Sequence, residues 1–520
     1  MRLLRLGLKE FKNLRDFAIE FDPGHAVSVI VGRNGTGKSN LLESLSIIFR
    51  DLDLGEPTPF QYSLDYECRG HKVSIRADPT ARARRRITID GRRASLSVLQ
   101  GKEGVRLLPD FVFGYYSGPT NRLEQHFSRH HNIFNKALRD GDDRPLRRLF
   151  YAQPTHSQFV LLAFFLDDDP AVTEFLKEYL RIESLESVLF ILREPPWSSN
   201  SGNARFWNAR GAVADLLDHL YDLSLAPMRL SLDADIGGRR SRREHLYLYL
   251  QDLNRVRRLA NESYGNDPQA LFKAFESILA ADLLSEVRVR VRAHGVDGSL
   301  VFRELSEGEQ QLLMVLGLLR FTRENESLFL LDEPDTHLNP SWSLRYTEML
   351  EEHSGAGSAT SQLVMATHDP LVIAGLRREQ VAILDRESST GEVKASRPEK
   401  DPQGMGVAGL LTSDVYDLAS ELDKATLDKL EKRRWLAAAD DLSPEEAVEL
   451  ANLTKELEDL DFTFTTRDPL YTEFERAMAS IERVDRPVLS REEGEKERRD
   501  ALETLRQLVE DANGIDGGVG

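Results

Sequence analysis

Three glycines, a lysine and a serine lie close together in the segment GRNGTGKSN, residues 32–40. The segment fits the pattern G-x-x-x-x-G-K-S, in which Gly32 and Gly37 bound the loop and Lys38 and Ser39 follow it. Glycine lets successive backbone N–H groups approach phosphate oxygens, because it has no Cβ and tolerates a positive φ. A lysine ammonium contacts the β and γ phosphates, and a serine hydroxyl can ligate Mg²⁺. The segment therefore predicts a nucleotide site with Mg²⁺.

The flanking segments predict the elements that hold this loop. HAVSVIV, residues 25–31, is typical of a short buried strand, and NLLESLSIIFR, residues 40–50, is typical of a helix with one apolar face. The amino end of that helix would point at the phosphates, where its dipole favours negative charge. The residues expected to bind the nucleotide here are Asn34, Gly35, Gly37, Lys38, Ser39 and Asn40. A glycine-rich turn that binds nothing is the simpler alternative, and the order strand, loop, helix argues against it.

A second set of polar residues follows an apolar run in SLFLLDEPDTHLNP, residues 327–340. The run Leu328–Leu331 predicts a buried parallel strand, and such strands place ligands at their carboxyl ends. Asp332 at that end is a candidate ligand of Mg²⁺. Glu333 is a candidate general base for an attacking water, an effect worth about 10² to 10⁴ in rate. A strand that only happens to end in an acidic turn becomes an unlikely alternative once the glycine-rich loop is considered.

Two more segments could contact phosphate. In ELSEGEQQLLMVLGLLRF, from residue 304, Ser306 and Gly308 stand where a helix is expected to start, and Ser306 is a good N-cap. The free N–H groups at such a helix start can bind an anion. In LVMATHDP, residues 363–370, an apolar strand ends in His368, whose imidazole could contact a γ-phosphate.

The order GRNGTGKS, LSEGEQQ, LLDEPDTHLNP, ATHDP resembles ATPases of the ATP-binding-cassette (ABC) type, in the soluble branch that holds the SMC, RecF and OLD proteins. The resemblance covers about residues 1–120 and 285–395. It implies an α/β fold: an ABC-type P-loop ATPase head with an antiparallel β-lobe, a helical insertion and a C-terminal helical extension. It also implies two heads that dimerise head to tail around ATP.

Carried over to this chain, the resemblance gives each motif a role. Lys38 and Ser39 would bind phosphate and Mg²⁺ within one chain, and Asp332 would ligate the Mg²⁺. Glu333 would be the catalytic base and His368 the switch histidine. The residues that would reach the ATP of the partner head are Ser306, Gly308 and Glu309. The signature differs from the transporter form LSGGQ by carrying Glu307 and Glu309, which is common in the soluble branch. The Q-loop glutamine stays unassigned among Gln100, Gln125 and Gln158.

A narrower resemblance concerns bacterial defence ATPases. The opening hairpin, FGYYSGPTNRLEQHF at 113–127 and FTFTTRDPLYTEFERAM at 462–478 are similar to the PtuA group of Septu and retron-associated systems. That resemblance implies a regulatory subunit that works with a separate HNH-type nuclease, and it implies a homodimer or higher homo-oligomer. The alternative is a RecF-like DNA-repair ATPase that binds DNA directly. A neighbouring HNH gene would favour the first hypothesis, and a replication or recombination operon would favour the second.

Length and composition limit the possibilities further. The chain has 520 residues with 41% hydrophobic and 30% charged residues, which suits a globular protein of several domains. The sequence contains no run of 18 apolar residues, so no membrane span is predicted, and the first residues lack the pattern of a signal peptide. The single cysteine, Cys68, excludes an internal disulfide and fits a reducing compartment, so we expect a cytoplasmic protein.

Four parts are expected along the chain: an ATPase N-lobe with the glycine-rich loop and a β-lobe (1–120), a helical insertion (121–285), an ATPase C-lobe (286–400) and an acidic helical extension (401–520). Residues 61–100 alternate apolar and polar residues, with turn signals at Arg69-Gly70 and Asp90-Gly91. No heptad pattern is sustained, so no long coiled-coil arm is expected. Residues 421–520 hold 27 acids and 15 bases, a net charge of −12 out of −18 for the chain. This acidic face could dock a basic partner or simply be solvated.

Basic clusters raise the question of nucleic acid. The densest one comprises Arg82, Arg84, Arg85, Arg86, Arg92 and Arg93. Two smaller ones comprise Arg239, Arg240, Arg242 and Arg243, and Arg144, Arg147 and Arg148. Grouped arginines bind phosphates without regard to sequence, but salt bridging with the many acids is the competing interpretation. His126, His130 and His131 could suggest a metal site. Without a distant third ligand they are better explained as helical surface or interface residues.

Overall fold

The computed structural model describes most of the chain in two compact units, Met1–Gln403 and Gly404–Gly520. The described residues are 1–142, 147–197, 202–236, 239–295, 299–322, 326–353, 361–387, 389–418, 420–439, 442–460, 499, 503 and 506. The second unit begins three residues after the expected start of the acidic extension. The segment at 462–478, the expected last helix near 493–511 and Arg144 lie outside the described residues.

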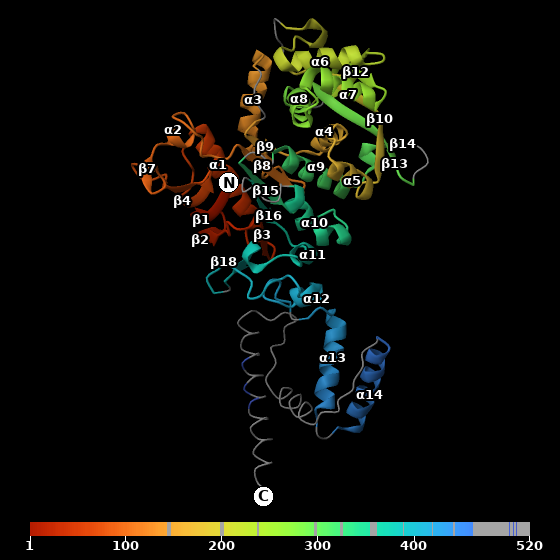
Figure 1. Cartoon of the computed structure of the whole chain (residues 1–520). Coiled ribbons are helices and arrows are strands. Elements are labelled where there is room, and N and C mark those ends of the chain that lie inside the picture. Colours follow the sequence, from red (N-terminus) through yellow and green to blue (C-terminus); the bar gives the residue numbers. More distant parts are fainter. Residues whose placement is uncertain are drawn as a thin grey trace. The chain divides into compact units, whose positions relative to one another are not determined.

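A seven-stranded sheet forms the centre of the first unit (Figure 1). Its strands, in spatial order, are β18 (Val393–Ser396), β17 (Val381–Arg386), β3 (Val27–Gly32), β16 (Ser361–Ala366), β15 (Ser327–Asp332), β8 (Phe111–Tyr116) and β9 (Leu149–Tyr151). All neighbours are parallel except β17 and β18. Asp332 pairs with Ala366 and Leu384 pairs with Gly32, so the carboxyl ends of these strands meet at one edge.

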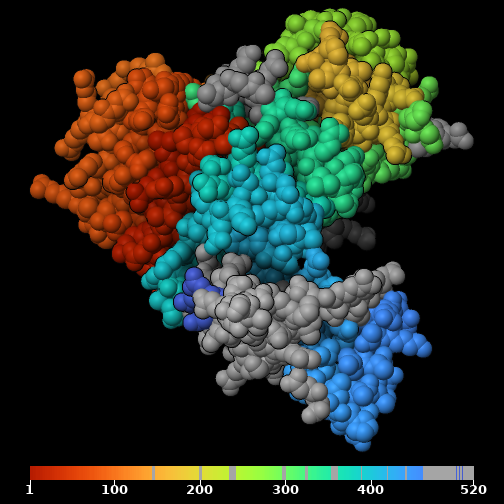
Figure 2. Space-filling model, turned by 60° about the horizontal axis from the view of Figure 1, so that its bottom comes forward, coloured from red at the N-terminus to blue at the C-terminus, as the bar shows by residue number. Residues whose placement is uncertain are grey.

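The N-terminal strands form a separate antiparallel sheet, which we call the β-lobe; it is largely red and orange in Figure 2. Its strands, in spatial order, are β2 (Leu14–Glu20), β1 (Arg2–Phe11), β4 (Tyr62–Cys68), β5 (His71–Ala77), β6 (Arg85–Ile89) and β7 (Arg92–Ala94), followed by the short helix α2 (Leu96–Leu99). Tight turns fall at Arg69-Gly70 and Asp90-Gly91 with positive φ, as the sequence predicts. Alternating buried residues such as Leu64, Tyr66 and Ile75 join one continuous core with α1 (Lys38–Leu54).

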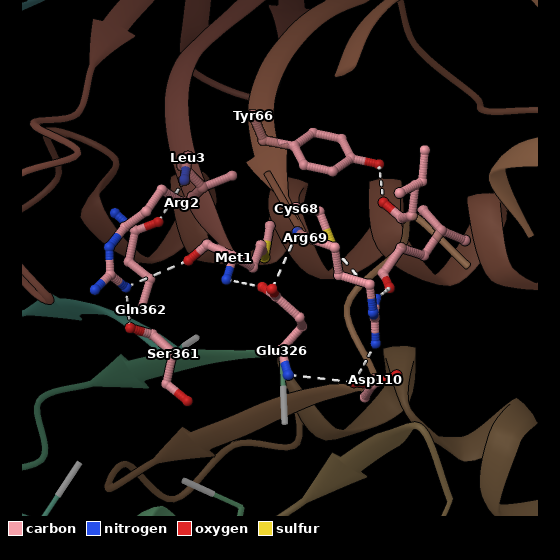
Figure 3. A network of polar contacts seen from close by, with 12 residues as sticks. Met1, Arg2, Leu3, Tyr66, Cys68, Arg69, Asp110, Glu326, Ser361 and Gln362 are labelled. Atoms are coloured by element: carbon pink, nitrogen blue, oxygen red, sulfur yellow. Dashed lines mark hydrogen bonds and ion pairs between the residues drawn. The ribbon is translucent and has the colours of Figure 1, made fainter. Parts of the chain in front are cut away.

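A polar network ties the β-lobe to the start of β15 (Figure 3). The Glu326 carboxylate accepts a hydrogen bond from the Arg69 backbone N–H at 3.0 Å and pairs with the Met1 amine. The Arg69 guanidinium in turn binds the Asp110 carboxylate, which also accepts a 3.2 Å bond from the Glu326 backbone N–H. The lobe is therefore held to the strand that carries Asp332 at its other end. The Leu3 backbone N–H adds a bond to the side chain of Gln362 in β16.

Helices cover the central sheet. Helix α9 (Glu307–Thr322) precedes β15, while α10 (Pro340–His353) follows β15 and α11 (Pro370–Ile373) follows β16. Gly317 of α9 lies against Val160 of α4 (Pro154–Phe164), where an added Cβ would come within 2.1 Å of Val160 Cγ1. The helix with the Ser306 motif is therefore closely packed on the inserted segment. None of the described helices is long and apolar enough to cross a bilayer.

The inserted segment is not only helical, and in this respect the expectation for residues 121–285 is wrong. Its helices besides α4 are α3 (Ser128–Asp140), α5 (Pro170–Glu178), α6 (Gly211–Leu223), α7 (Leu253–Tyr264) and α8 (Pro268–Ala280). They accompany an antiparallel sheet of β11 (Met228–Ile236), β12 (Arg239–Leu250), β10 (Ile182–Arg193), β13 (Leu284–Ala293) and β14 (Ser299–Val301), in that spatial order. Since β13 and β14 complete this sheet, the expected boundary at 285 divides one structural layer. Figure 1 shows β10, β12 and β13 together with α6, α7 and α8, in colours from yellow to green.

The second unit contains α12 (Gly406–Leu411), α13 (Lys424–Ala437) and α14 (Pro444–Glu458). α14 begins at a capping box, since the Ser443 and Glu446 side chains each accept a hydrogen bond from the backbone N–H of the other residue. α13 and α14 pair through Lys432–Glu449 and Lys429–Glu456 contacts.

Candidate functional site

The phosphate loop lies between β3 and α1 in a conformation that glycine favours. Gly32, Gly35 and Gly37 have φ values of 151°, 84° and 101°. A Cβ on Gly32 would lie 2.3 Å from the Leu384 carbonyl oxygen, so the loop passes close to β17. The Gly35 carbonyl accepts hydrogen bonds from Asn13 at 2.9 Å and from Arg386 at 3.1 Å. These two contacts brace the loop from the β1–β2 turn and from β17.

Lys38 lies at the amino end of α1 and is 7% exposed. Its Nζ donates to the Gly32 carbonyl at 2.7 Å, so the ammonium lies back over the loop. Burial lowers the pKa of Lys38, and Glu333 and Asp332 partly oppose that effect. The cation is therefore near both carboxylates at the end of β15, as the two motifs together predicted.

Asp332 and Ser39 form the expected pair. Burial raises the pKa of Asp332 to about 6, against the opposing effects of a Ser39 hydrogen bond, Arg122 and Lys38. Asp332 Oδ1 is buried and has no hydrogen-bond partner among the described residues. A buried carboxylate oxygen without a partner is costly unless a ligand satisfies it. A hydroxyl beside such a carboxylate is an oxygen donor set that suits Mg²⁺, so these residues fit the ion.

Glu333 and His368 also meet at this edge. His368 Nδ1 lies 3.3 Å from Glu333 Oε1, and the two side chains are 59% and 32% exposed. Glu333 has a φ of 52°, which is unusual for a residue with a Cβ, and its N–H donates to the Ala366 carbonyl at 2.8 Å. The turn therefore lifts the Glu333 carboxylate out of the strand toward solvent, where it can reach a water.

Two neighbouring residues were not singled out by the sequence. Asp335 is 4% exposed, and its Oδ2 accepts a 2.5 Å hydrogen bond from the Thr367 hydroxyl. Burial raises its pKa to about 6. Thr367 Oγ1 also accepts from the Asp369 N–H at 2.9 Å. These hydrogen bonds link the turn after β15 to the turn that carries His368. The position of Asp335, three residues after Asp332, was the only feature of the sequence that pointed to a role for Asp335.

Arg122 is the second missed residue. Its Nη2 donates to Asn40 Oδ1 at 2.6 Å and lies 3.6 Å from the buried Glu43 carboxylate. Glu43 also binds His126 at 2.8 Å and pairs with Lys12. Burial raises the pKa of Glu43, but its hydrogen bonds from His126 and Lys12 bring the net pKa below its usual value. Arg122 thus holds a fixed positive charge beside the amino end of α1.

The Ser306 segment caps α9. The Ser306 hydroxyl donates to the Glu309 carboxylate at 2.8 Å, while the Glu309 N–H donates to the Ser306 oxygen at 3.3 Å. Ser306 is exposed. Gly308 is buried against the turn after β15, because a Cβ there would lie 2.2 Å from the His337 carbonyl oxygen. The hydrogen bonds that the structure describes for Ser306 stay within this cap, and none of them reaches the phosphate loop of its own chain.

The three glutamines differ in surroundings. Gln100 donates to the carbonyls of Leu52 and Asp53 at the far end of α1, and Gln125 donates to Arg122 at 2.8 Å. Gln158 is buried in α4, and its Oε1 has no described partner. None of these contacts reaches the phosphate loop, so the Q-loop residue stays unassigned.

Two of the three histidines pair with carboxylates, and the third contacts an arginine. His130 lies 2.7 Å from Asp53, His126 binds Glu43, and His131 contacts Arg147. Among the described residues no three histidine, cysteine or acidic side chains gather as metal ligands. His126 and His130 therefore join α3 and the turn before it to α1 as interface residues, whereas His131 contacts the segment before β9.

The basic clusters separate into paired and unpaired ones. Arg147 binds the buried Glu276 at 2.7 Å, and Arg148 binds Asp53 at 3.2 Å. The situation differs on the β-lobe, where five exposed arginines form no ion pair with any described residue. We call these five the arginine surface: Arg82, Arg84, Arg86, Arg92 and Arg93. The competing interpretation, that this cluster forms salt bridges, therefore does not hold for these five arginines among the described residues. Arg239 and Arg240 lie in β12, and Arg243 donates to the Glu194 carbonyl at 3.4 Å.

Comparisons with known proteins bear on this site. The family model described as "AAA domain, putative AbiEii toxin, Type IV TA system" matches residues 27–374. The Septu protein PtuA of Bacillus mycoides (strain KBAB4) is 27% identical over 229 residues, which is 42% of this chain and 30% of that protein. The replication and repair protein RecF of Teredinibacter turnerae is 44% identical over 46 residues, 9% of this chain and 12% of RecF. The chain thus matches less than a third of the length of either relative.

Solved structures were compared as well. The SMC head domain from Thermotoga maritima is 17% identical, with a TM-score of 0.32, over 77% of this chain and all of that one. A SmcHead bound to the C-winged helix domain of ScpA is 13% identical, with a TM-score of 0.34, over 76% of this chain and 97% of that one.

Proposed function

Because the chain belongs to the family of AAA domains described as putative AbiEii toxins of type IV TA systems, with an ABC-type P-loop ATPase domain, we propose that it is an ATP-hydrolysing regulatory subunit of a bacterial antiphage defence complex, acting in the cytoplasm. One observation carries the ATPase part. Lys38, the Ser39–Asp332 pair and the Glu333–His368 pair gather at one edge of the central sheet, although they come from three distant segments.

Each group has a task in this proposal. The loop N–H groups and Lys38 bind the phosphates, and the low exposure of Lys38 strengthens its attraction for them. Mg²⁺, held by Ser39 and Asp332, would neutralise charge on the transferred phosphoryl group. Glu333 accepts a proton from the attacking water. His368, 3.3 Å from Glu333, holds that carboxylate in place and contacts the γ-phosphate side of the site.

The proposal includes a head-to-tail homodimer, or a higher homo-oligomer built from it, and the position of Ser306 supports it. That residue is exposed at the start of α9, and its described hydrogen bonds are local. In the proposed dimer the Ser306, Gly308 and Glu309 cap closes over the ATP bound to the partner's phosphate loop. ATP binding then favours the closed dimer, because only that state uses both sets of contacts.

In this proposal, the ATP-dependent dimerisation controls the activity of a separate HNH-type nuclease subunit. Support comes from the similarity to PtuA over 42% of the chain and from the resemblance of the opening hairpin and of residues 113–127 and 462–478 to that group. The acidic extension offers a surface for a basic partner. Different dimer geometries with and without ATP would present different contacts to the nuclease, which is the requirement for regulation by ligand.

The second candidate is a RecF-like ATPase that binds DNA directly. The match to RecF and the arginine surface favour it. The two candidates differ in whether the chain alone retains DNA at physiological salt.

Glu333→Gln tests the catalytic proposal. The variant should keep ATP and Mg²⁺ but lose hydrolysis by about 10²-fold or more, because the base is removed and the binding groups remain. Glu348→Gln on α10 is a matched control with an exposed carboxylate, and it should hydrolyse ATP normally. Normal turnover in Glu333→Gln would remove this residue from the role.

Co-expression with the product of an adjacent HNH gene tests the partner. The two proteins should co-purify, and the nuclease activity should differ between ATP and ADP. In Glu333→Gln the nuclease activity should stay at the level seen with ATP, because this variant keeps ATP without hydrolysing it. DNA binding by the chain alone, with no co-purifying nuclease, would instead favour the RecF-like candidate.

A further inference from the structure

A cavity of about 660 Å³ opens in the β-lobe, between the carboxyl end of α1 and the strands β6 and β7. We call it the arginine pocket, and its main lining residues are Arg84, Arg85, Ile87, Arg93, Ala94 and Leu96. Three of the lining residues are arginines and most of the others are apolar. No carboxylate lines the pocket. Its volume lies within the range of about 300–1,000 Å³ that is usual for small-molecule sites.

The arginines of the pocket have hydrogen-bonding capacity left over. The side chains of Arg84 and Arg93 make no hydrogen bond or ion pair with described residues. Arg85 donates one Nη2 bond to the Glu56 carbonyl, but its Nε is buried without a partner. A guanidinium presents a planar fork that matches the oxygens of a phosphate, and buried donors favour a ligand that satisfies them.

Two features act against an anion here. The carboxyl end of α1 is at Leu54, so its partial negative charge faces this region, an effect of about two- to fivefold on binding. The Asp51 carboxylate also acts on Arg85, although Arg50 binds that carboxylate directly at 2.7 Å. Each charge-assisted hydrogen bond from an arginine is worth about tenfold or more, so three arginines outweigh both effects.

We propose that the arginine pocket binds one nucleotide unit, with its phosphate on Arg84 and Arg93 and its base against Ile87 and Leu96. A phosphate alone would not need the apolar residues of the pocket. A flat base would cover their aliphatic surface well, so they favour a nucleotide over a phosphate ion. The unit has two sources, a free nucleotide or the end of a single strand, because both present the same phosphate and base.

The pocket is remote from the phosphate loop, because the two lie at opposite ends of α1. Helix α1 has 17 residues, so about 25 Å separates Lys38 at one end from the pocket at the other. If the proposed ATPase function holds, this second site gives the regulatory subunit a place to sense nucleic acid or nucleotide apart from the ATP that it hydrolyses.

The test uses full-length protein carrying Lys38→Ala, so that the phosphate loop contributes no binding and a failure here is separate from a failure of the ATPase proposal. Calorimetry with AMP and fluorescence anisotropy with a labelled 12-nucleotide single strand measure the two sources. The key variant is Arg84→Ala with Arg93→Ala. The matched control is Arg86→Ala with Arg92→Ala, which removes the same charge from the arginine surface but not from the pocket.

Removing the two pocket arginines should weaken binding by about 10- to 100-fold, while the control pair should weaken it by about threefold or less. Ala94→Phe, which fills the pocket and leaves every charge, should also abolish binding, with circular dichroism confirming its fold. If only the strand binds with this pattern, the strand is the source; if AMP binds too, the free unit is recognised. Equal losses in the two double variants, an unaffected Ala94→Phe, or no binding of either probe would overturn the proposal.

Discussion

Replacing Asp332 by asparagine should make the ligand-free protein more stable while it removes Mg²⁺ binding. The carboxyl is 2% exposed, and burial raises its pKa to about 6 from 3.8. Between these two values the folded protein keeps a proton that the unfolded chain has lost, so stability falls as the pH rises through this window. Above pH 6 the ionised, buried group is a constant cost, which asparagine avoids because it carries no charge.

The size of the effect follows from the two pKa values. They differ by about 2, and a difference of one corresponds to about 1.36 kcal/mol, so Asp332 costs about 3 kcal/mol at pH 8. At pH 5 the cost should be about half of this, because the folded carboxyl is then mostly protonated while the unfolded one is mostly ionised. Asp332→Asn should gain these amounts in the free energy of unfolding.

Urea unfolding at pH 5 and pH 8 measures this gain. Asp140→Asn, which changes an exposed carboxyl on α3, is the control and should change stability by about 0.5 kcal/mol or less. Adding Mg²⁺ and ATP should reverse the order of the two proteins, since ligand at about 1,000 times Kd stabilises only the wild type by about 4.1 kcal/mol, which exceeds the cost of about 3 kcal/mol at pH 8. A variant that is no more stable than the wild type at pH 8, or one whose gain is equal at both pH values, would refute the reasoning from burial.

Three further variants test the other contacts. Lys38→Ala should abolish ATP binding in calorimetry, because the phosphates lose their buried cation; an unchanged affinity would contradict that role. Gly308→Ala should destabilise the protein by about 1–3 kcal/mol in urea, since its Cβ would lie 2.2 Å from the His337 carbonyl oxygen. Gly375→Ala, where the nearest atom is 4.0 Å away, should cost far less, and equal costs would count against the steric argument. Ser306→Arg should prevent ATP-dependent dimerisation in sedimentation while one chain still binds ATP, and a normal dimer would argue against a shared site.

The sequence predicts those parts of the site that depend on short-range patterns. The loop from Gly32 to Ser39 could be read from glycine spacing and from the apolar runs beside it. The strand before Asp332 could be read from four consecutive apolar residues. The paired turns of the β-lobe follow from Arg69-Gly70 and Asp90-Gly91, where a positive φ is needed.

What the sequence did not predict depends on contacts between distant residues. Arg122 reaches Asn40 across 82 positions, and no local pattern marks that pairing. The strand β11 begins at Met228 on the edge of its sheet, and its alternating apolar residues are exposed, so their pattern does not mark a buried face that would predict a strand. The sequence likewise could not predict that the arginine surface has no acidic partner among the described residues, because the chain has more acids than bases.

The carboxylate of Glu326 has consequences for how this chain can vary. It accepts a backbone bond from Arg69, while Arg69 and the Glu326 backbone both bind Asp110, so segments near positions 69, 110 and 326 converge on two acidic side chains (Figure 3). The side chains of Arg69 and Asp110 bind each other, so a substitution at either one leaves the other charge without its counterpart, whereas the contacts to the backbone N–H groups of residues 69 and 326 persist whatever side chains stand there. In an alignment of relatives positions 69 and 110 should therefore change together, and position 326 should vary independently of both.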